Sequence, residues 1–180
     1  MQPLGSPLPG FELTDTRTGQ AVRSRDFEGR PLLVMFLCNH CPYVKHVRDQ
    51  LAALGREHAN GPLAIVAISS NDPVAYPEDA PDRMTDEARE AGYVFPYCFD
   101  ASQQVARDFD AACTPDFFLY DPRHQLAYRG RLDASRPKSP MPVTGADLRA
   151  AIDAVLAGRA PAEPQHPSIG CSIKWRASGA

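Results

Sequence analysis

The feature that most constrains this chain is an apolar run that ends in two cysteines and continues as an amphipathic pattern. Leu32–Leu37 is continuously apolar, which predicts a strand buried on both faces. From Pro42 to His58 the apolar residues recur at helical spacing, which predicts a helix. Cys38 and Cys41 are therefore expected at a junction where a core strand ends and a helix begins.

Pro42 indicates which cysteine carries the chemistry. Proline is favoured at the first helical position, because its missing N–H would be unpaired there, so Cys41 is expected at the N-cap. A sulfur at that position faces free helix amides and the positive end of the helix dipole, and both stabilise a thiolate. Since the thiolate is the nucleophile, we expect Cys41 to be the attacking thiol and Cys38 its partner. His40 and Lys45 would add positive potential.

The rest of the chain alternates between the two kinds of secondary structure. Strands are expected at 11–13, 21–22, 63–69, 95–99, 116–120 and 126–131, and helices at 82–91, 102–109 and 144–158. Thr144 is expected to open the last helix, with Asp147 completing a capping box. This order predicts an α/β fold with a central mixed sheet flanked by helices and an N-terminal β-hairpin. One domain is expected over residues 1–158, with an extended C-terminal tail, 159–180, packed on it.

Charge and hydropathy narrow the class of function. The formal net charge is −3, which argues against a nucleic-acid partner because phosphate binding needs a basic face. The longest apolar run, Leu32–Cys38, is far too short to cross a bilayer, so no membrane partner is expected. Residues 1–10 contain neither a positive charge nor an apolar stretch, so no signal peptide is predicted and a cytoplasmic location is expected.

Cysteine usage leaves more than one interpretation open. The sequence has five cysteines, which are Cys38, Cys41, Cys98, Cys113 and Cys171. In a reducing compartment a close pair is more often redox-active or metal-binding than a structural disulfide. One alternative is a pair of inert core thiols. Another is a zinc or copper site with ligands from Cys38, His40, Cys41 and His46. A structural zinc site normally draws on a second, distant ligand pair, which the sequence lacks, so no cofactor is expected.

A second landmark is Cys113–Thr114–Pro115–Asp116, which directly precedes a predicted strand. Proline is tolerated at the first residue of a strand. The Thr114–Pro115 bond is open to two interpretations, a cis bond in a tight approach or an ordinary trans bond in a loop.

The two landmarks together resemble the thioredoxin superfamily. The closer resemblance is to its redoxin branch, the alkyl hydroperoxide reductase/thiol-specific antioxidant type, and within it to a bacterial peroxiredoxin-like group. The segments that carry it are 36–45, 114–118 and 169–175. The resemblance spans essentially the whole chain and implies a thioredoxin-like fold with Pro115 as a cis-proline beside the active sulfur. The Cys-Pro pair of peroxiredoxins aligns with Cys41–Pro42, in agreement with the N-cap argument.

Three departures from known patterns limit the functional expectation. Cys38 replaces the threonine that peroxiredoxins carry three residues before the reactive cysteine, which makes an efficient peroxidase less expected. Lys45 stands where copper-delivering Sco-type proteins carry a second cysteine, which disfavours copper delivery. No tryptophan precedes the motif, so a standard thioredoxin is not implied.

The other cysteines and charged residues receive individual expectations. Cys98 is expected in the core, and Cys113 is either a packing residue or a resolving thiol. Cys171 is a candidate resolving thiol, because related peroxidases carry a C-terminal resolving cysteine. Against that, Ile169 and Trp175 are expected to pin the tail on an apolar patch. The acidic residues expected to form a solvated face are Asp79, Asp82, Asp86, Glu87 and Glu90.

The sequence therefore predicts an oxidoreductase that performs thiol–disulfide exchange with Cys41 and Cys38. The backbone at Thr114 would hold an extended substrate chain. The expected partners are a disulfide-bearing protein or a small thiol, and a thiol reductant such as a thioredoxin. A peroxide is the alternative substrate, with Cys41 passing through a sulfenic acid that Cys38, Cys113 or Cys171 resolves. A metal-binding module is the third hypothesis.

Overall fold

The fold is built on a mixed β-sheet. The computed structural model describes residues 2–177, and within them a seven-stranded sheet has the order β2-β1-β5-β4-β3-β7-β8. Its strands are β1 Glu12–Asp15, β2 Ala21–Arg23, β3 Leu32–Phe36, β4 Ala64–Ser69, β5 Tyr97–Phe99, β7 Asp116–Tyr120 and β8 Leu126–Gly130. β4 runs parallel to β3 and β5, whereas the other neighbours are antiparallel. The predicted α/β architecture with a mixed sheet and an N-terminal hairpin is confirmed.

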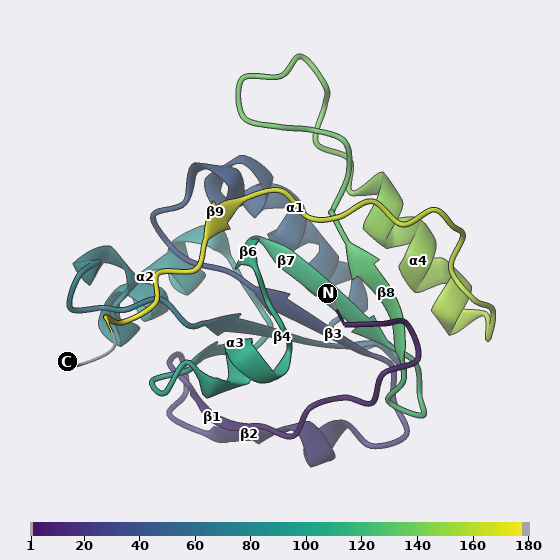
Figure 1. The fold of residues 1–180 in the computed structure, drawn as a ribbon, viewed down its shortest axis with the longest axis horizontal. Helices are drawn as coiled ribbons and strands as arrows, with labels where there is room; N and C mark the ends of the chain where they lie inside the picture. The colour runs from purple at the N-terminus through teal and green to yellow at the C-terminus, as the bar shows by residue number, and fades with distance from the viewer. Residues whose placement is uncertain (1, 178–180) are drawn as a thin grey trace.

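Helices cover both faces of the sheet (Figure 1). They are α1 Pro42–His58, α2 Pro81–Ala91, α3 Gln104–Asp108 and α4 Ala146–Leu156, with short 3-10 turns at Ser24–Phe27 and Pro77–Asp79. The bounds of α1 are those predicted from the sequence. α2 ends as predicted at Gly92, which adopts a left-handed conformation (φ 71°) that costs glycine little.

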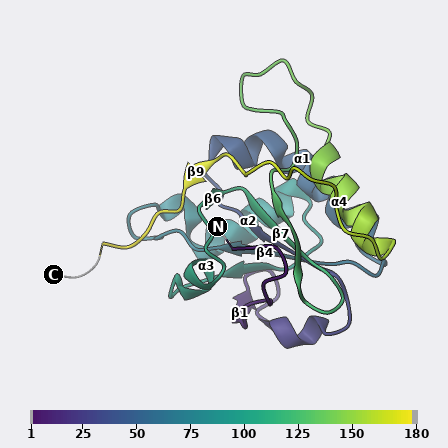
Figure 2. The same ribbon diagram turned by 45° about the vertical axis from the view of Figure 1, so that its right-hand side comes forward.

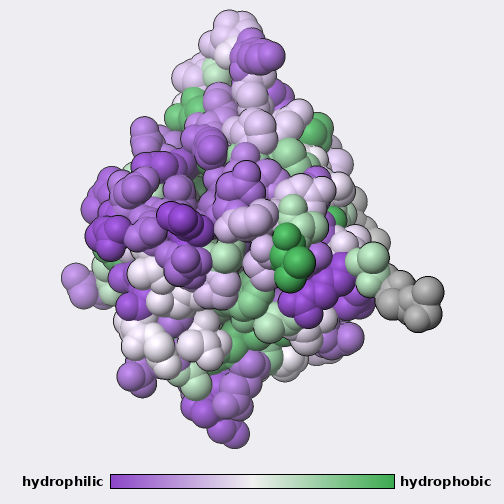
Figure 3. All heavy atoms as spheres, turned by 90° about the vertical axis from the view of Figure 1, so that its left-hand side faces the viewer, coloured by the Kyte–Doolittle hydropathy of each residue, from purple (hydrophilic) through white to green (hydrophobic). Residues whose placement is uncertain are grey.

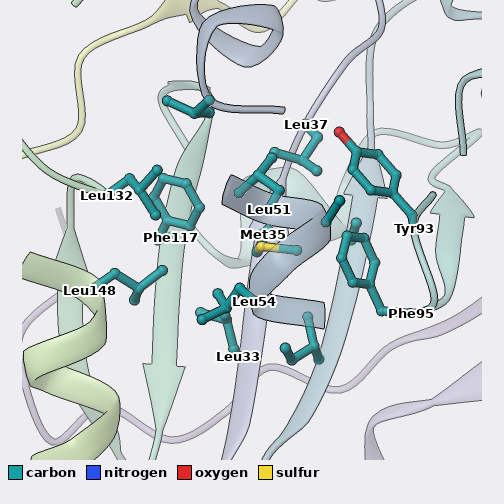
Figure 4. Packing of buried hydrophobic residues seen from close by; sticks show 14 of the residues in the cluster. Leu33, Met35, Leu37, Leu51, Leu54, Tyr93, Phe95, Phe117, Leu132 and Leu148 are labelled. Carbon is teal, nitrogen blue, oxygen red and sulfur yellow. The ribbon is translucent and has the colours of Figure 1, made fainter. Parts of the chain in front are cut away.

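The two faces of β3 serve two separate apolar cores. Leu33 and Met35 pack with residues of α1 and α4, including Leu51, Leu54 and Leu148, as Figure 4 shows. The alternate residues Leu32, Val34 and Phe36 face the other core, together with α3. Because consecutive strand residues point to opposite faces, a continuous apolar run is what a doubly covered strand requires.

The second core is rich in aromatic rings. Phe36 contacts Phe109 and Phe118 edge-on, with ring centroids 5.4 and 5.7 Å apart. Such edge-to-face pairs add about 1 kcal/mol each beyond their buried area. These contacts fix the end of β3, and with it the start of the cysteine segment.

The predicted capping box at the start of α4 is wrong. The N-cap is Gly145 (φ 69°), and the helix begins at Ala146. The carboxylate of Asp133 accepts the N–H groups of Thr144 and Gly145, at 2.7 and 2.6 Å. Asp147 instead pairs with Arg131. The acceptor of these two N–H groups is therefore Asp133, which is distant in sequence, and not a residue of the local capping box that the sequence suggested.

The C-terminal tail returns to the sheet and adds a short strand. β9 Cys171–Ser172 pairs antiparallel with β6 Cys113–Thr114, directly before Pro115. Figures 1 and 2 show the tail, in yellow, crossing from α4 to a position beside β6.

The prediction that Ile169 and Trp175 pin the tail is wrong. These side chains are 51% and 41% exposed, whereas Ile173 is 3% exposed and packs in the second core. Trp175 instead lies under the guanidinium of Arg107, with 4.8 Å between the guanidinium carbon and the ring centroid. The pairing of β9 with β6 determines which tail residues are buried. That pairing cannot be read from the composition of the tail.

The face of the molecule shown in Figure 3 is mainly hydrophilic, with hydrophobic residues below its centre and at a few separate places. Among residues 2–177, no helix is both long and apolar enough to cross a membrane.

Candidate active site

Cys41 lies at the start of α1. It is the N-cap residue, with extended backbone angles, and Pro42 takes the first helical position as predicted. The first helical hydrogen bond runs from the Lys45 N–H to the Cys41 carbonyl, at 3.0 Å. The side chain of Cys41 is fully buried. The Cys41 sulfur therefore lies at the amino end of α1 and is shielded from water.

Thr114 is the point where the two sequence landmarks meet. Cys38 Sγ lies 3.2 Å from the Thr114 hydroxyl, and Cys41 Sγ lies 3.2 Å from the Thr114 carbonyl oxygen. The Thr114–Pro115 bond is cis, as the resemblance implied. Both sulfurs thus lie against a single residue that is far from them in sequence.

Cys171 reaches the same place from the tail. In the β6–β9 pair, Cys171 stands opposite Thr114. The approach is close, because a Cβ on Gly170 would lie 2.0 Å from the Thr114 carbonyl oxygen. Only glycine fits there without a shift of the backbone. Glycine at position 170 is therefore required to bring Cys171 beside Cys41.

The thiols of Cys38, Cys41 and Cys171 have very different pKa values. A hydrogen bond from Cys38 lowers the pKa of Cys41 to about 4, against the opposing effect of burial, and the Cys171 thiol and N–H add to the lowering. The amide of Val44 in the first helical turn contributes too. The same hydrogen bond, together with burial, raises the pKa of Cys38 far above its ordinary value. Burial and the neighbouring Cys41 raise the pKa of Cys171 to about 11. The arrangement stabilises one thiolate flanked by two protonated thiols.

The remaining cysteines are less suited to reaction. Burial raises the pKa of Cys113 to about 12, and the charges of Asp116 and Cys41 add to the rise. Cys113 Sγ lies 3.7 Å from the Pro115 carbonyl oxygen. Cys98 is fully buried in β5, which confirms the expectation of a core residue. Burial also raises its pKa to about 12.

Asp79 does not lie on a solvated face, and that prediction is wrong for this residue. It is fully buried and accepts three hydrogen bonds of 2.6–2.8 Å, from Asn39 N, His40 Nδ1 and Asn71 Nδ2. The loop after β4 folds over the cysteine segment and carries this carboxylate inward. Asp79 and Asn71 were missed because their partners are distant in sequence. The available signal was an aspartate in a proline-rich loop directly after a core strand.

The other predicted acidic residues stay near the surface. Asp82 and Glu90 are exposed, as expected. Asp86 pairs with Arg89 at 2.5 Å, and Glu87 pairs with Arg48 at 3.4 Å.

The charged groups expected around Cys41 are arranged differently from the prediction. His40 is bound to Asp79 and stacks on Tyr76, with ring centroids 5.2 Å apart. Lys45 is exposed on α1, and His46 Nε2 lies 3.1 Å from the Ser135 hydroxyl. The largest effects on the pKa of Cys41 come from thiols, burial and amides, and those of His40 and Lys45 are not among them.

A polar network joins the tail to the cysteine segment. The Lys174 N–H donates to Asn71 Oδ1 at 2.8 Å, and Asn71 Nδ2 donates to Asp79 at 2.7 Å. Lys174 Nζ also lies 5.6 Å from the centroid of the Tyr76 ring. Asn71 and Asp79 therefore link the tail to His40.

The metal-ligand set expected from sequence is only partly assembled. Among the described residues, the donor atoms of Cys38, His40 and Asp79 lie within 4.8 Å of one another, and Cys41 is not part of this group. The His40 and Asp79 donors already hydrogen-bond each other at 2.6 Å. The structure therefore brings together three possible ligand atoms, two of which already bond each other.

Comparisons with known proteins show where similar chains occur. The model of the AhpC/TSA family matches residues 4–129. An uncharacterized conserved protein from Geobacillus kaustophilus is 49% identical, with a TM-score of 0.96 over 99% of this chain and 95% of its own. A hypothetical protein from Sinorhizobium meliloti 1021 is 47% identical, with a TM-score of 0.96 over 99% of this chain and 97% of its own.

A more distant similarity concerns the fold. A putative thioredoxin from Neisseria meningitidis is 19% identical and has a TM-score of 0.65 over 83% of this chain and 89% of its own. A comparison with curated proteins returned no match.

Proposed function

This chain belongs to the AhpC/TSA family and has a thioredoxin-like fold, and from that premise we propose that it is a thiol–disulfide oxidoreductase using Cys41 and Cys38. The observation that carries the proposal is the convergence of both sulfurs on Thr114, with Cys41 at the amino end of α1. Thiolates at helix N-termini are stabilised and react as nucleophiles. The contrast in acidity between the two thiols supports Cys41 as the attacking thiol.

The exchange proceeds in two balanced steps. The Cys41 thiolate attacks one sulfur of a disulfide, forms a mixed disulfide and releases the other half as a thiolate. Cys38 then loses its proton and attacks the Cys41 sulfur, which releases the second half as a thiolate and closes the Cys38–Cys41 disulfide. A thiol reductant, such as a thioredoxin, restores the two thiols.

Proton transfer from Cys38 needs an acceptor, because burial and its neighbours keep this thiol protonated. Asp79 and His40 have donor atoms within 4.8 Å of the Cys38 sulfur. In the proposed mechanism, this hydrogen-bonded pair takes the proton once Cys41 has become part of the mixed disulfide. Cys38 is then activated only in the intermediate that requires it.

Access to the site favours small partners. The expected substrate-binding backbone at Thr114 is occupied by β9. Both Cys38 and Cys41 are buried, so a protein disulfide cannot reach them while the tail is docked. In the docked state, we therefore favour a small disulfide over a protein disulfide.

A single-turnover experiment with oxidised glutathione tests the proposal. The reduced protein is mixed with the disulfide, quenched in acid and mapped by mass spectrometry. The wild type is expected to form the Cys38–Cys41 disulfide, and Cys41→Ser is expected to form no disulfide at Cys38. Cys98→Ser is the control and should match the wild type. Full exchange by Cys41→Ser would rule the proposal out.

Peroxide reduction is a second candidate, favoured by the same burial of Cys41. A small oxidant fits an enclosed sulfur better than a protein does. Cys41 would displace water from hydrogen peroxide and become a sulfenic acid, which Cys38 would condense with to give the disulfide and a second water. Peroxide consumption that exceeds exchange with oxidised glutathione would place this activity first.

A further inference from the structure

Accessibility separates Cys171 from the other cysteines. Cys38, Cys41, Cys98 and Cys113 are all buried, whereas Cys171 is partly exposed. Among the five cysteines, Cys171 is therefore the residue most open to a thiol from solvent while the chain keeps this conformation.

Cys171 also lies close to the reactive sulfur. It stands opposite Thr114 in the β6–β9 pair, and the carbonyl oxygen of the same Thr114 lies 3.2 Å from Cys41 Sγ. Cys171 is also among the groups that lower the pKa of Cys41. One cysteine thus adjoins the enclosed nucleophile and also presents surface to solvent.

The tail is anchored on both sides of Cys171. On one side, Gly170 fits closely against Thr114. On the other side, Ile173 is buried in the second core. The Lys174 carbonyl accepts hydrogen bonds of 2.9 Å from Gln103 Nε2 and from the Asp72 N–H. These contacts keep Cys171 beside Cys41, so a route through Cys171 does not need the tail to leave.

We propose that Cys171 is a third redox-active cysteine, which forms a transient disulfide with Cys41 and exposes its own sulfur to small-molecule thiols. This inference rests on the proposed function in one respect, namely that Cys41 is the reactive sulfur. It adds a route between the enclosed Cys38–Cys41 pair and solvent. The partner class is a low-molecular-weight thiol, because the accessible surface is that of a single, partly exposed residue held in a docked strand.

The relay conserves atoms and electrons at each step. Cys171 loses its proton to solvent and attacks Cys41 of the Cys38–Cys41 disulfide, which gives a Cys41–Cys171 disulfide. The released Cys38 sulfur takes a proton from the Asp79–His40 pair. A small thiolate then attacks the Cys171 sulfur and releases the Cys41 thiolate. A second small thiol attacks the mixed disulfide on Cys171, which leaves a small disulfide and the Cys171 thiol. Overall, two small thiols are oxidised and the Cys38–Cys41 disulfide is reduced.

The chemistry of the leaving group supports this direction. In disulfide exchange a less basic sulfur leaves faster, and the pKa of Cys41 lies well below that of Cys171. Attack at Cys171 therefore expels the better leaving group. In the Cys41–Cys171 disulfide, attack at Cys41 would meet an enclosed sulfur and expel Cys171, the more basic of the two thiols.

The first test measures how fast reduced glutathione opens the Cys38–Cys41 disulfide. Cys171→Ser is expected to slow this reaction by roughly 100-fold, since the exposed sulfur is lost. Ser172→Ala is the matched control, because Ser172 is the exposed neighbour in the same strand, and it should match the wild type. An equal rate in Cys171→Ser and the wild type would overturn the relay.

The second test is independent of the Cys38–Cys41 disulfide. Cys38→Ser, treated with oxidised glutathione, is expected to form a Cys41–Cys171 disulfide that peptide mapping detects. Adding Gly170→Ala to this variant keeps Cys171 but forces the tail away from Thr114, and should remove the disulfide. No Cys41–Cys171 disulfide in Cys38→Ser would overturn the relay.

The two proposals fail in distinguishable ways. If the wild type forms the Cys38–Cys41 disulfide but Cys171→Ser changes nothing, only the relay is wrong. If Cys41→Ser still exchanges fully, the proposed function is wrong, and the relay falls with it.

Discussion

Cys41 and Cys98 are both fully buried, yet they lie in regions with opposite effects on a thiol. In the middle of β5, burial raises the pKa of Cys98 to about 12. At the start of α1, the pKa of Cys41 falls to about 4 despite the same burial. The difference lies in the donors, since Cys41 receives hydrogen bonds from Cys38 and Cys171. Burial alone makes a cysteine inert, and burial among donors makes it a nucleophile.

The largest expected difference between the two regions is in the effects of replacing Cys41 and of replacing Cys98. Cys41→Ser should lose the thiolate absorbance near neutral pH and slow disulfide exchange by roughly 1000-fold. Cys98→Ser should keep both properties. Ultraviolet titration of the reduced proteins measures the thiolate, and an unchanged titration in Cys41→Ser would place it on another residue.

The same contrast should appear in the pH dependence of stability. The lowered pKa of Cys41 means that between about pH 4 and the ordinary pKa of 9.0 the unfolded chain binds a proton that the folded chain does not. The free energy of unfolding should therefore rise with pH across this window, by up to about 1.4 kcal/mol per pH unit.

Urea unfolding at pH 5, 6, 7 and 8 measures this slope. Cys41→Ser should lack the contribution, while Cys98→Ser should retain it, because the raised pKa of Cys98 leaves it protonated in both states below pH 9. Parallel curves for the wild type and Cys41→Ser would contradict an acidic Cys41.

Asp79 tests the surroundings of the cysteine segment without changing a sulfur. Asp79→Asn leaves the donors of Asn39, His40 and Asn71 short of an acceptor, and should cost about 2 kcal/mol of unfolding free energy. Asp82→Asn, on an exposed residue of α2, should stay within about 0.5 kcal/mol. Chemical denaturation compares the two, and equal stabilities would show that the buried carboxylate contributes little.

The smallest effect is expected at Cys98 itself. Cys98→Ala removes one buried sulfur from β5 and should cost about 1 kcal/mol. The rate of exchange at Cys41 should not change. A loss of exchange activity in Cys98→Ala would mean that the two regions are coupled.

The parts of the site that follow from nearby residues were predictable. The bounds of α1 and the N-cap position of Cys41 follow from a change of hydrophobic period and from Pro42. The cis bond before Pro115 came from the resemblance. Each of these features depends on a few consecutive residues or on a recognisable motif.

The parts that depend on distant partners were not predictable. Asp79 looked like one acidic residue among several, and only the folding of its loop over His40 shows that it is buried. In the tail, Ile169 and Trp175 were expected to be the anchors, but strand pairing with β6 buries Ile173 instead. A single sequence shows which residues can pair, and the fold decides which of them meet.

The return of the tail to β6 also sets an order of events during synthesis. The chain is synthesised from its amino end, and β9 is translated after every strand of the main sheet and every helix. A nascent chain can therefore form β3, α1 and the cysteine segment before Cys171 exists to cover them. During that interval Cys41 lacks the cover of β9, and pairing of the tail with β6 completes it.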